Sequence, residues 1–258
     1  MEHKTQHLTN IPEGNYKSDP ASESWDDRTA RLLGDDAMKA LAGASVLVAG
    51  LGGVGGYAAE ILVRTGIGRL TIIDADNVAT SNINRQLIAL RSSVGSPKAI
   101  LFAERFHDIN PEASINAMQM YIDPEGAGGL LDEGYDYVLD CIDTVAPKVA
   151  LIEQCMRRHI PVISSMGAGG RIDPTQIGYR DLWATRDDGL ARAVRQQLKK
   201  RGIRHPLMTV SSSERPDRHS LLDVEEKNKR TSYGSLASVP AIFGIFMANY
   251  VIRKIINI

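Results

Sequence analysis

Residues 45–76 limit the choice of fold more than any other part of the chain. Residues 46–49 are a short apolar run typical of a buried strand. The segment GLGGVG follows at 50–55, and after it come a helical pattern over 57–64 and a second apolar run at 70–73. A strand, a glycine-rich turn, a helix and a second strand form a βαβ unit, the repeating unit of a parallel sheet covered by helices.

The glycine-rich turn predicts a nucleotide site. Its glycines are Gly50, Gly52, Gly53 and Gly55. They allow a tight turn and a close approach of the backbone to a phosphate, while the helix N-terminus supplies N–H groups and the positive end of its dipole. Asp74 ends the second strand 19 residues after the last of these glycines, near the spacing at which an acid holds a ribose hydroxyl. This combination favours a nucleotide site over a purely structural turn.

Strands and helices alternate along most of the chain. Further strands are expected at 114–121, 135–140, 161–165 and 206–211, and further helices at 25–41, 97–108, 146–158, 186–201 and 236–252. This alternation predicts an α/β, Rossmann-like, doubly wound and mostly parallel sheet with helices on both faces. We expect a flexible tail at 1–24, a single domain over 25–258, and a less regular pattern within it from 172 onward.

Composition excludes several classes of protein. With 258 residues and a formal net charge of −1, the chain has no overall attraction for nucleic acid or an anionic membrane, so such a partner needs a local patch. Cys141 and Cys155 form no C-x-x-C pair, which excludes a four-cysteine zinc site and favours the cytoplasm. No signal peptide is seen, and the apolar run at 236–252 is interrupted by Pro, Gly and Asn, so we expect no membrane span.

Polar side chains follow the second strand of the βαβ unit and begin the next helix. Asn82 and Arg85 are three residues apart, on one helical face that is either a solvated surface or a pair of donors for phosphates. Lys98 stands in the first turn of a helix that Ser96 would cap and Pro97 would start. A cation at that end opposes the helix dipole unless an anionic ligand is present.

Two carboxylates follow another expected strand. Asp140 and Asp143 come at its carboxyl end, the edge where doubly wound sheets bind ligands. Asp143 either caps the next helix or holds Mg²⁺ against a triphosphate. Binding of NAD does not need so many phosphate-directed groups, although a dehydrogenase stays an alternative. A reaction at the α-phosphate of ATP, with loss of pyrophosphate, does need them.

Several motifs resemble those of known families. GLGGVG at 50–55, DADNVATSNINRQ at 74–86, SPK at 96–98 and DCID at 140–143 resemble the adenylating core of the ubiquitin-activating-type superfamily. ARLLG at 30–34, RTGIG at 64–68 and GAGGRIDPTQI at 167–177 are similar to motifs of bacterial tRNA threonylcarbamoyladenosine dehydratases. That family uses ATP to cyclise a modified adenosine in tRNA. The resemblance therefore implies an ATP-dependent dehydratase that passes through a carboxyl adenylate.

The resemblance also implies roles for individual residues. ATP contacts would come from the four turn glycines and from Asp74, Asp76, Asn82, Arg85, Gln86, Lys98 and Asp143. Asp143 would also hold Mg²⁺, and the catalytic set would be Asp143, Arg85, Lys98 and Arg28. In the superfamily an arginine such as Arg28, or alternatively Arg31, reaches the ATP of a neighbouring subunit, which implies a homodimer. Residues 25–258 would then be one ATP-binding adenylating domain, with 172–258 its substrate-binding and C-terminal helical part.

The chain lacks features common among protein-activating members of the superfamily. It has no cysteine after Cys155 and no pair of C-x-x-C motifs, so a thioester to a carrier protein has no obvious acceptor. An internal cyclisation needs none. An adenylating activator of a small sulfur-carrier or ubiquitin-like protein, without its own catalytic cysteine, remains the alternative. A sulfur-transfer partner such as a cysteine desulfurase is also left open.

A basic segment near residue 195 is the candidate tRNA surface. Arg192, Arg195 and Lys199 share one stripe at helical spacing, and Lys200 and Arg201 follow. Such a concentration of cations in a chain of net charge −1 is suited to a phosphate backbone. The alternative is an ordinary solvated helix face. No aromatic residue interleaves the stripe, so we expect contacts to phosphates rather than stacked bases.

Overall fold

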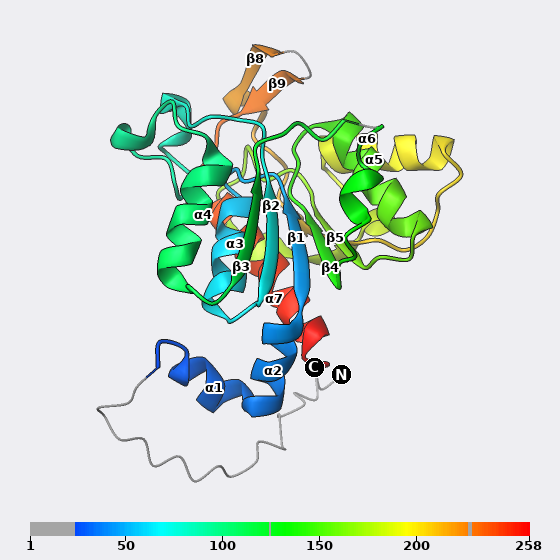
Figure 1. Ribbon diagram of the computed structural model, residues 1–258. Helices are drawn as coiled ribbons and strands as arrows, with labels where there is room; N and C mark the ends of the chain where they lie inside the picture. The colour runs from blue at the N-terminus through cyan, green and yellow to red at the C-terminus, as the bar shows by residue number, and fades with distance from the viewer. Residues whose placement is uncertain (1–23, 124, 227–228) are drawn as a thin grey trace, which may run out of the picture.

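One seven-stranded sheet runs through the protein in the order β3-β2-β1-β4-β5-β7-β6 (Figure 1). The structure, a computed structural model, describes residues 24–123, 125–226 and 229–258, so the expected tail lies outside the described residues except for Ser24. All neighbouring strands are parallel except β6 and β7. The strands are β1 (Ser45–Ala49), β2 (Arg69–Ile73), β3 (Ser114–Met118), β4 (Tyr137–Asp140), β5 (Val162–Ser165), β6 (Ile177–Asp181) and β7 (Met208–Ser212).

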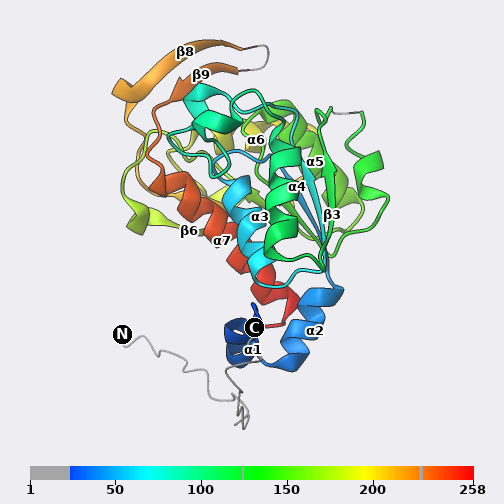
Figure 2. The ribbon, with the colours of Figure 1, turned by 60° about the vertical axis from the view of Figure 1, so that its left-hand side comes forward.

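Helices cover both faces of this sheet, which confirms the predicted Rossmann-like class. Figures 1 and 2 show α3, α4 and α7 on one face and α5 and α6 on the other, with α1 and α2 beyond the end of the sheet. The helices are α1 (Asp27–Leu33), α2 (Asp35–Gly43), α3 (Gly55–Arg64), α4 (Lys98–Ile109), α5 (Val145–Arg157), α6 (Gly189–Lys200) and α7 (Ser238–Ile255).

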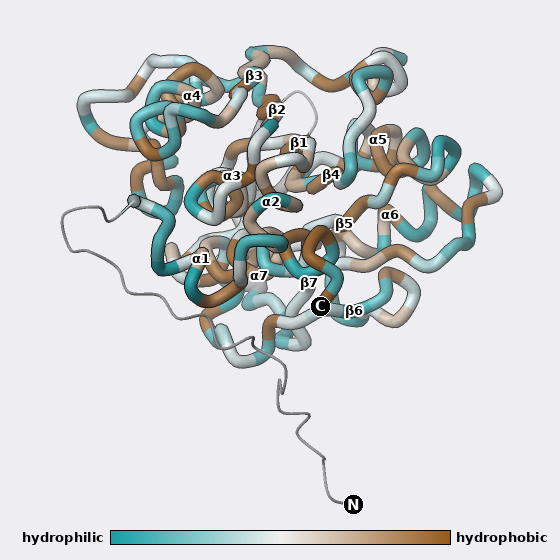
Figure 3. The backbone as a smooth tube through the Cα atoms, turned by 60° about the horizontal axis from the view of Figure 1, so that its bottom comes forward, coloured by the Kyte–Doolittle hydropathy of each residue, from teal (hydrophilic) through white to brown (hydrophobic). Residues whose placement is uncertain are grey.

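The central strand explains why both faces need cover. Successive side chains of a strand point to opposite faces, and in β1 all but the first residue are buried. Val46 and Val48 join the apolar cluster of α3 and α7, whereas Leu47 and Ala49 join that of α5. In Figure 3 the brown, apolar stretches occur both in the central strands and in α3 and α7. A strand that is apolar on both sides is stable only between two layers of helices.

The path of the chain creates a crevice at the carboxyl ends of the strands. From β1 the chain builds β2 and β3 on one side, then returns to place β4 on the other side of β1. Such a switch point is where open α/β sheets bind ligands. The two loops that leave β1 and β4 touch here, because a Cβ placed on Gly50 would lie 3.0 Å from the carbonyl oxygen of Cys141.

Three local predictions were wrong. The helix expected at 25–41 is broken into α1 and α2 at Gly34, whose φ of +83° interrupts a helix. The polar segment after β2 enters only a short 3₁₀ turn, η2 (Thr80–Asn82), and no α-helix. Pro97 is the N-cap of α4 and not its first helical residue, since its ψ of 128° is extended.

The segment after residue 172 contains more regular structure than its sequence suggests. It supplies β6 and β7 to the main sheet and α6 and α7 to the two faces. It also forms a two-stranded antiparallel hairpin, β8 (Leu221–Glu226) with β9 (Lys229–Tyr233). The hairpin stands above the carboxyl edge of the sheet in Figures 1 and 2.

Candidate functional site

The glycine-rich turn brings the start of α3 against the end of β1. A Cβ on Gly55 would lie 1.7 Å from the carbonyl oxygen of Gly50, so no side chain fits there. Among the described residues no side chain caps α3, whose N-cap is Val54. The positive end of the helix and the backbone of the turn are therefore available to an anion.

Asp74 lies beside this turn at the end of β2. Its Oδ2 accepts a hydrogen bond from the Leu51 N–H at 2.6 Å, and its Oδ1 accepts one from the Asp76 N–H at 2.8 Å. Burial raises the pKa of the Asp74 carboxyl, and the charge of Lys98 opposes that rise. The predicted ribose acid is thus held by the same backbone that would hold the phosphates.

Lys98 reaches the same place from the first turn of α4. Its side chain is only 4% exposed, and its Nζ lies 2.8 Å from Asp76 Oδ2 and 3.9 Å from Asp74 Oδ1. A lysine in the first turn of a helix is unfavourable by itself, and here two carboxylates balance it. The structure therefore brings Asp74, Asp76 and Lys98 together.

The loop after β2 carries the three remaining polar candidates of this side. The Oδ1 of Asn82 accepts from the Ala79 N–H at 3.1 Å, which closes the 3₁₀ turn. Arg85 Nη1 donates at 2.8 Å both to the Ser81 carbonyl and to Asn84 Oδ1. These bonds keep the guanidinium on the same exposed loop as Asn82.

Gln86 is buried at the turn and lacks a partner for one atom. Its side chain is 8% exposed, and no group in the described part of the chain hydrogen-bonds to its Oε1. Its Nε2 lies 3.8 Å from where a Cβ on Gly52 would be. A buried amide with a free polar atom beside a cradle that only glycine permits fits a polar ligand at this turn.

Asp143 lies in the loop that leaves β4, the strand on the other side of β1 from β2. It is exposed in the loop between β4 and α5, and Thr144 rather than Asp143 occupies the N-cap position of α5. No group of three or more His, Cys, Asp or Glu side chains suited to a metal occurs within the described ranges. A magnesium ion here would therefore take one carboxylate from the protein and its other oxygens from phosphates and water.

Sequence reasoning missed a lysine behind this loop. Lys148 of α5 is fully buried, and its Nζ lies 2.8 Å from Asp140 Oδ2. The signal was present in the sequence PKVALI at 147–152, in which one cation stands among apolar residues of a helix. A charge in such surroundings needs a buried partner, and Asp140 at the end of β4 is that partner.

Comparison with known proteins decides the family. The family model described as the ThiF family matches residues 26–258. The chain belongs to the ThiF family. A tRNA threonylcarbamoyladenosine dehydratase of Escherichia coli K12 is 48% identical over 181 residues, which are 69% of this chain and 68% of that protein. The Bacillus subtilis protein of the same name is 38% identical over 238 residues, or 89% of this chain and 94% of its own length.

A solved structure agrees with the sequence relatives. The E. coli tRNA N6-threonylcarbamoyladenosine dehydratase in complex with ATP has a TM-score of 0.83 to this ThiF-family chain, with 39% identity. The match covers 90% of this chain and 93% of that one. The fold and the order of the site-bearing elements are therefore those of an ATP-binding relative.

Arg28 of this ThiF-family chain lies far from its own glycine turn. It is exposed on α1, and α1 and α2 lie beyond the amino ends of the strands, at the opposite end from the turn (Figure 1). The alternative, Arg31, pairs with Asp27 at 3.6 Å on the same helix. Neither arginine is brought to the predicted ATP site of the same chain.

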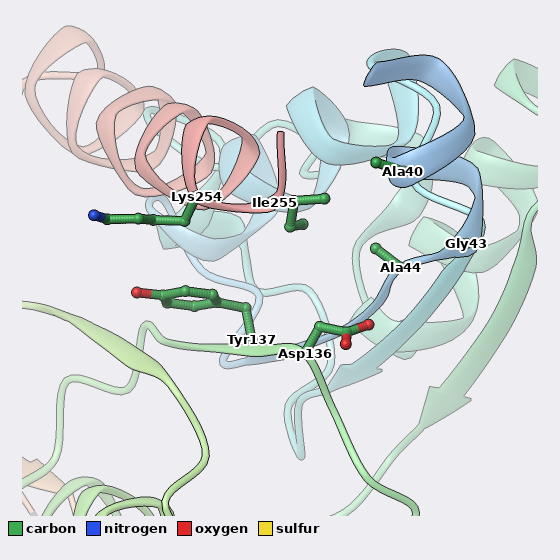
Figure 4. Close-up of a pocket in the computed structure, with 7 residues that line it drawn as sticks. All are labelled: Ala40, Gly43, Ala44, Asp136, Tyr137, Lys254 and Ile255. Carbon is green, nitrogen blue, oxygen red and sulfur yellow. The ribbon is translucent and has the colours of Figure 1, made fainter. Parts of the chain in front are cut away.

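Two hollows in the described part of the chain also lie at that opposite end. One of about 350 Å³ lies where α2 and the end of α7 meet the start of β4, and Figure 4 shows Asp136, Tyr137 and Lys254 among its lining residues. Another, of about 440 Å³, includes Tyr137 and Tyr250. Neither contains a predicted nucleotide-binding residue. The glycine turn instead offers open backbone N–H groups and a helix N-terminus, the features that bind phosphates.

The candidate tRNA surface is only partly available. Arg192, Lys199 and Lys200 are exposed on α6, which docks through the buried Ala191, Val194 and Leu198. Arg195 instead donates at 3.0 Å to the Leu182 and Thr185 carbonyls and also bonds to the Thr185 hydroxyl. Arg201 pairs with Glu153 at 2.5 Å. The tRNA role of all five stays a prediction, and Arg195 has an internal role that the stripe pattern did not indicate.

No helix in the described part of the chain is long and apolar enough to cross a membrane. The terminal apolar run instead forms α7, in which Phe243 is fully buried and Phe246 is partly buried against the core.

Proposed function

We propose that this chain is an ATP-dependent tRNA threonylcarbamoyladenosine dehydratase. The observation that carries the proposal is the grouping of the glycine turn, Asp74 and Lys98 at the switch point of the sheet. Asp143 lies in the loop after β4, the strand next to β1. These residues belong to three strand-to-helix connections, which follow β1, β2 and β4, and each is of a type that suits ATP binding. The ATP complex of the E. coli relative, at 39% identity over 90% of this chain, supports the same ligand.

In the proposed complex Asp74 accepts a ribose hydroxyl and the turn backbone holds the phosphates. Asn82, Arg85, Gln86 and Lys98 complete the ATP contacts. Lys98 now pairs with Asp76, which is 69% exposed at its side chain. A partner so accessible to water holds a lysine weakly, so a polyphosphate with several charges can take its place. Asp143 would hold Mg²⁺, which neutralises the phosphates and polarises them for attack.

The proposed reaction forms and breaks two bonds at the substrate carboxylate. A carboxylate oxygen of the threonylcarbamoyl group attacks the α-phosphorus, and the bond to pyrophosphate breaks. An atom of the carbamoyl group then attacks the activated acyl carbon, and AMP leaves with the former carboxylate oxygen. One ring forms and the elements of water are lost, divided between AMP, pyrophosphate and the released proton. Arg85 and Lys98 would balance the charge that develops on the phosphates.

This sequence of steps needs neither a thiol nor sulfur transfer. Burial raises the pKa of Cys141 far above its ordinary value and that of Cys155 to about 12, so neither is a thiolate at neutral pH. This favours the dehydratase over an activator that forms a thioester with a carrier protein. A cysteine desulfurase is accordingly not part of the proposed reaction.

The remaining parts of the proposal concern assembly and place. Residues 25–258 would act as one adenylating domain, with 172–258 contacting the tRNA. Two copies would form a homodimer in which Arg28 of one chain approaches the ATP of the other, since it lies far from its own site. A tRNA substrate suits a cytoplasmic enzyme.

Nucleoside analysis tests the function directly. The purified protein is incubated with ATP, Mg²⁺ and unfractionated tRNA, and the tRNA is digested to nucleosides for mass spectrometry. We expect threonylcarbamoyladenosine to be replaced by a nucleoside lighter by one water, with AMP and pyrophosphate released. Exchange of pyrophosphate into ATP only with a small carrier protein would instead support the activator, and an unchanged nucleoside profile would refute the proposal.

A further inference from the structure

A closed ion pair lies directly behind the loop that carries Asp143. Asp140 ends β4 and Lys148 lies in the second turn of α5, and both side chains are 0% exposed. Ser164 of β5 donates its hydroxyl to Asp140 Oδ2 at 2.5 Å. No ligand can reach these groups, so they take no direct part in binding ATP or tRNA.

The pair holds both polar backbone groups of Ile142. Asp140 Oδ1 accepts the Ile142 N–H at 3.2 Å. Lys148 Nζ donates to the Ile142 carbonyl at 2.8 Å. The peptide groups on both sides of Ile142 are therefore fixed, and the next residue along the chain is Asp143.

The other side of the same loop is fixed to the phosphate-binding turn. The Cys141 N–H donates to the Ala49 carbonyl at 2.9 Å, and Ala49 is the residue before the turn. The Cys141 carbonyl lies against Gly50, where an added Cβ would be only 3.0 Å from its oxygen. The loop is thus held between the buried ion pair and the backbone that would carry the phosphates.

Stability alone does not require charges at this place. Taking two ions out of water is costly, and well-packed apolar side chains of similar size stabilise a core as well or better. Two apolar residues would leave the N–H and carbonyl of Ile142 without these partners. What the ion pair adds is a fixed backbone next to Asp143.

We propose that Lys148 and Asp140 are positioning residues. By fixing the backbone of Ile142, they hold the Asp143 carboxylate in the position from which it would bind the Mg²⁺ on the ATP phosphates. The inference rests on the role proposed for Asp143. It predicts that losing Lys148 loosens residues 141–144 and costs turnover, while the glycine turn, Asp74 and Lys98 still bind the nucleotide. A displacement of about 1 Å of a reacting group can cost about 100-fold in rate.

The test compares Lys148→Met with the parent in three measurements. Hydrogen exchange by mass spectrometry should show faster exchange in the peptide over 141–144. The Ile142 carbonyl loses its donor, and Asp140, which accepts the Ile142 N–H, loses the ion pair that holds it. Calorimetry should show similar ATP affinity in EDTA, but loss of the gain in affinity that Mg²⁺ gives the parent. With tRNA, kcat should fall by about 100-fold and the KM for ATP should change by no more than about threefold in either direction. Lys148→Arg, which restores the charge and donors, should recover part of the lost kcat.

Arg105→Met is the matched control, because Arg105 Nε forms a part-buried ion pair with Glu60 at 2.7 Å between α4 and α3. This control variant should be less stable than the parent. Its kcat, the increase in its ATP affinity on adding Mg²⁺, and its hydrogen exchange at 141–144 should equal those of the parent.

Lys148→Gln is measured alongside under the same criteria, in case the Met variant does not fold. Parent-like exchange at 141–144 together with parent-like kcat in a folded Lys148 variant overturns the positioning role. If Mg²⁺ does not increase the ATP affinity of the parent, the role of Asp143 as the metal ligand is itself overturned. The two failures are therefore distinguishable.

Discussion

Two aspartates lie at the carboxyl ends of β2 and β4, the strands on either side of β1. Each is beside a lysine, but only one is open to a ligand. Asp74 has a side chain 9% exposed beside Lys98, whereas Asp140 is 0% exposed beside Lys148. Burial raises the pKa of both carboxyls, and in each case the lysine opposes the rise. The same residue type therefore serves binding at one strand end and backbone geometry at the other.

Asp143→Ala tests the metal role at the level of a single carboxylate. The side chain is exposed, so its loss should change the free energy of unfolding by no more than about 0.5 kcal/mol. Turnover of ATP in the presence of tRNA should fall by about 100-fold or more, since the metal loses its link to the protein. Steady-state kinetics and thermal unfolding measure the two effects. A folded variant with the parent's rate would remove Asp143 from the mechanism.

Glu60 of α3 gives a prediction about pH. Burial alone would raise the pKa of this carboxyl, but hydrogen bonds and charges from Arg105 and Arg64 outweigh it and hold the pKa below its ordinary value of 4.5. Because the folded pKa is lowered, this stabilisation is present above pH 4.5 and is lost as the pH falls through the folded value. We expect Glu60→Gln to be less stable than the parent by about 1–2 kcal/mol at pH 7.

Comparing the stability of the parent and of Glu60→Gln at acid pH tests this explanation. Below pH 4.5 the parent also becomes protonated at this position, so the difference between parent and variant should narrow. Denaturant titrations at pH 7 and near pH 3.5 would measure it. A difference that stays constant with pH would show that packing, and not the ionised carboxylate, accounts for the cost.

At the scale of elements, the sequence predicts those parts in which one strong local signal decides the structure. The unit of β1, α3 and β2 follows from two apolar runs and a glycine turn, and the structure contains it at nearly the expected residues. The antiparallel β6 and the hairpin of β8 and β9 were missed. Short polar strands have little periodicity, and their formation depends on partners distant in the chain.

In the candidate site, too, local sequence signals predict some features, whereas others depend on how distant elements pack. Asp74 and Lys98 could be expected near the turn, because strand ends and helix starts of a parallel sheet share one edge. The bonds of Arg195 and Lys148 to backbone carbonyls could not, since they depend on how α6 and α5 pack. Periodicity locates a residue on a helix face but does not give the partner of a long side chain.

The exposed face of α6 tests the tRNA interaction. The double variant Arg192→Glu with Lys199→Glu should weaken tRNA binding, and the slope of log affinity against log salt should fall by roughly 0.7–0.9 for each phosphate that is no longer neutralised. Arg195 is left unchanged, because its bonds to Leu182 and Thr185 support the helix.

A control for this variant needs the same change of charge elsewhere. Lys39→Glu with Lys254→Glu reverses two charges at the amino ends of the strands, where Lys254 lines the hollow of Figure 4. In filter-binding measurements over a range of salt concentrations, the tRNA affinity and salt slope of the control should be close to those of the parent. Both should differ from those of the α6 variant. Equal slopes in all three proteins would make the α6 stripe an ordinary solvated face.

At the scale of the whole molecule, α1 packs only loosely against the rest of its own chain. None of its seven residues is buried, and Trp25 and Leu32 beside and within it are 49% and 69% exposed. Apolar side chains exposed on a helix that carries Arg28 suit contact with a second copy. We therefore expect a homodimer in which each site takes this arginine from its partner.

Subunit mixing tests this arrangement. Arg28→Ala and Asp143→Ala should each be inactive by themselves. After the two variants are unfolded and refolded together, random pairing should restore about a quarter of the parental sites, because each mixed dimer holds one site with both residues intact. Light scattering establishes the dimer independently. No recovery in a sample shown to contain mixed dimers would place Arg28 outside the partner's site.

The packing of α7 on α3 has a consequence for how the protein is made. Gly244 of α7 lies so close to α3 that a Cβ there would be 2.3 Å from the Val54 carbonyl oxygen, at the base of the phosphate-binding turn. A ribosome adds about 5–20 residues per second, so this cover is synthesised about 190 residues, or roughly 10–40 s, after the turn itself. During that interval α3 can pack against α4, but the part of its surface that α7 covers has no partner helix. A nascent chain therefore exposes this apolar part of α3 to aggregation until α7 emerges.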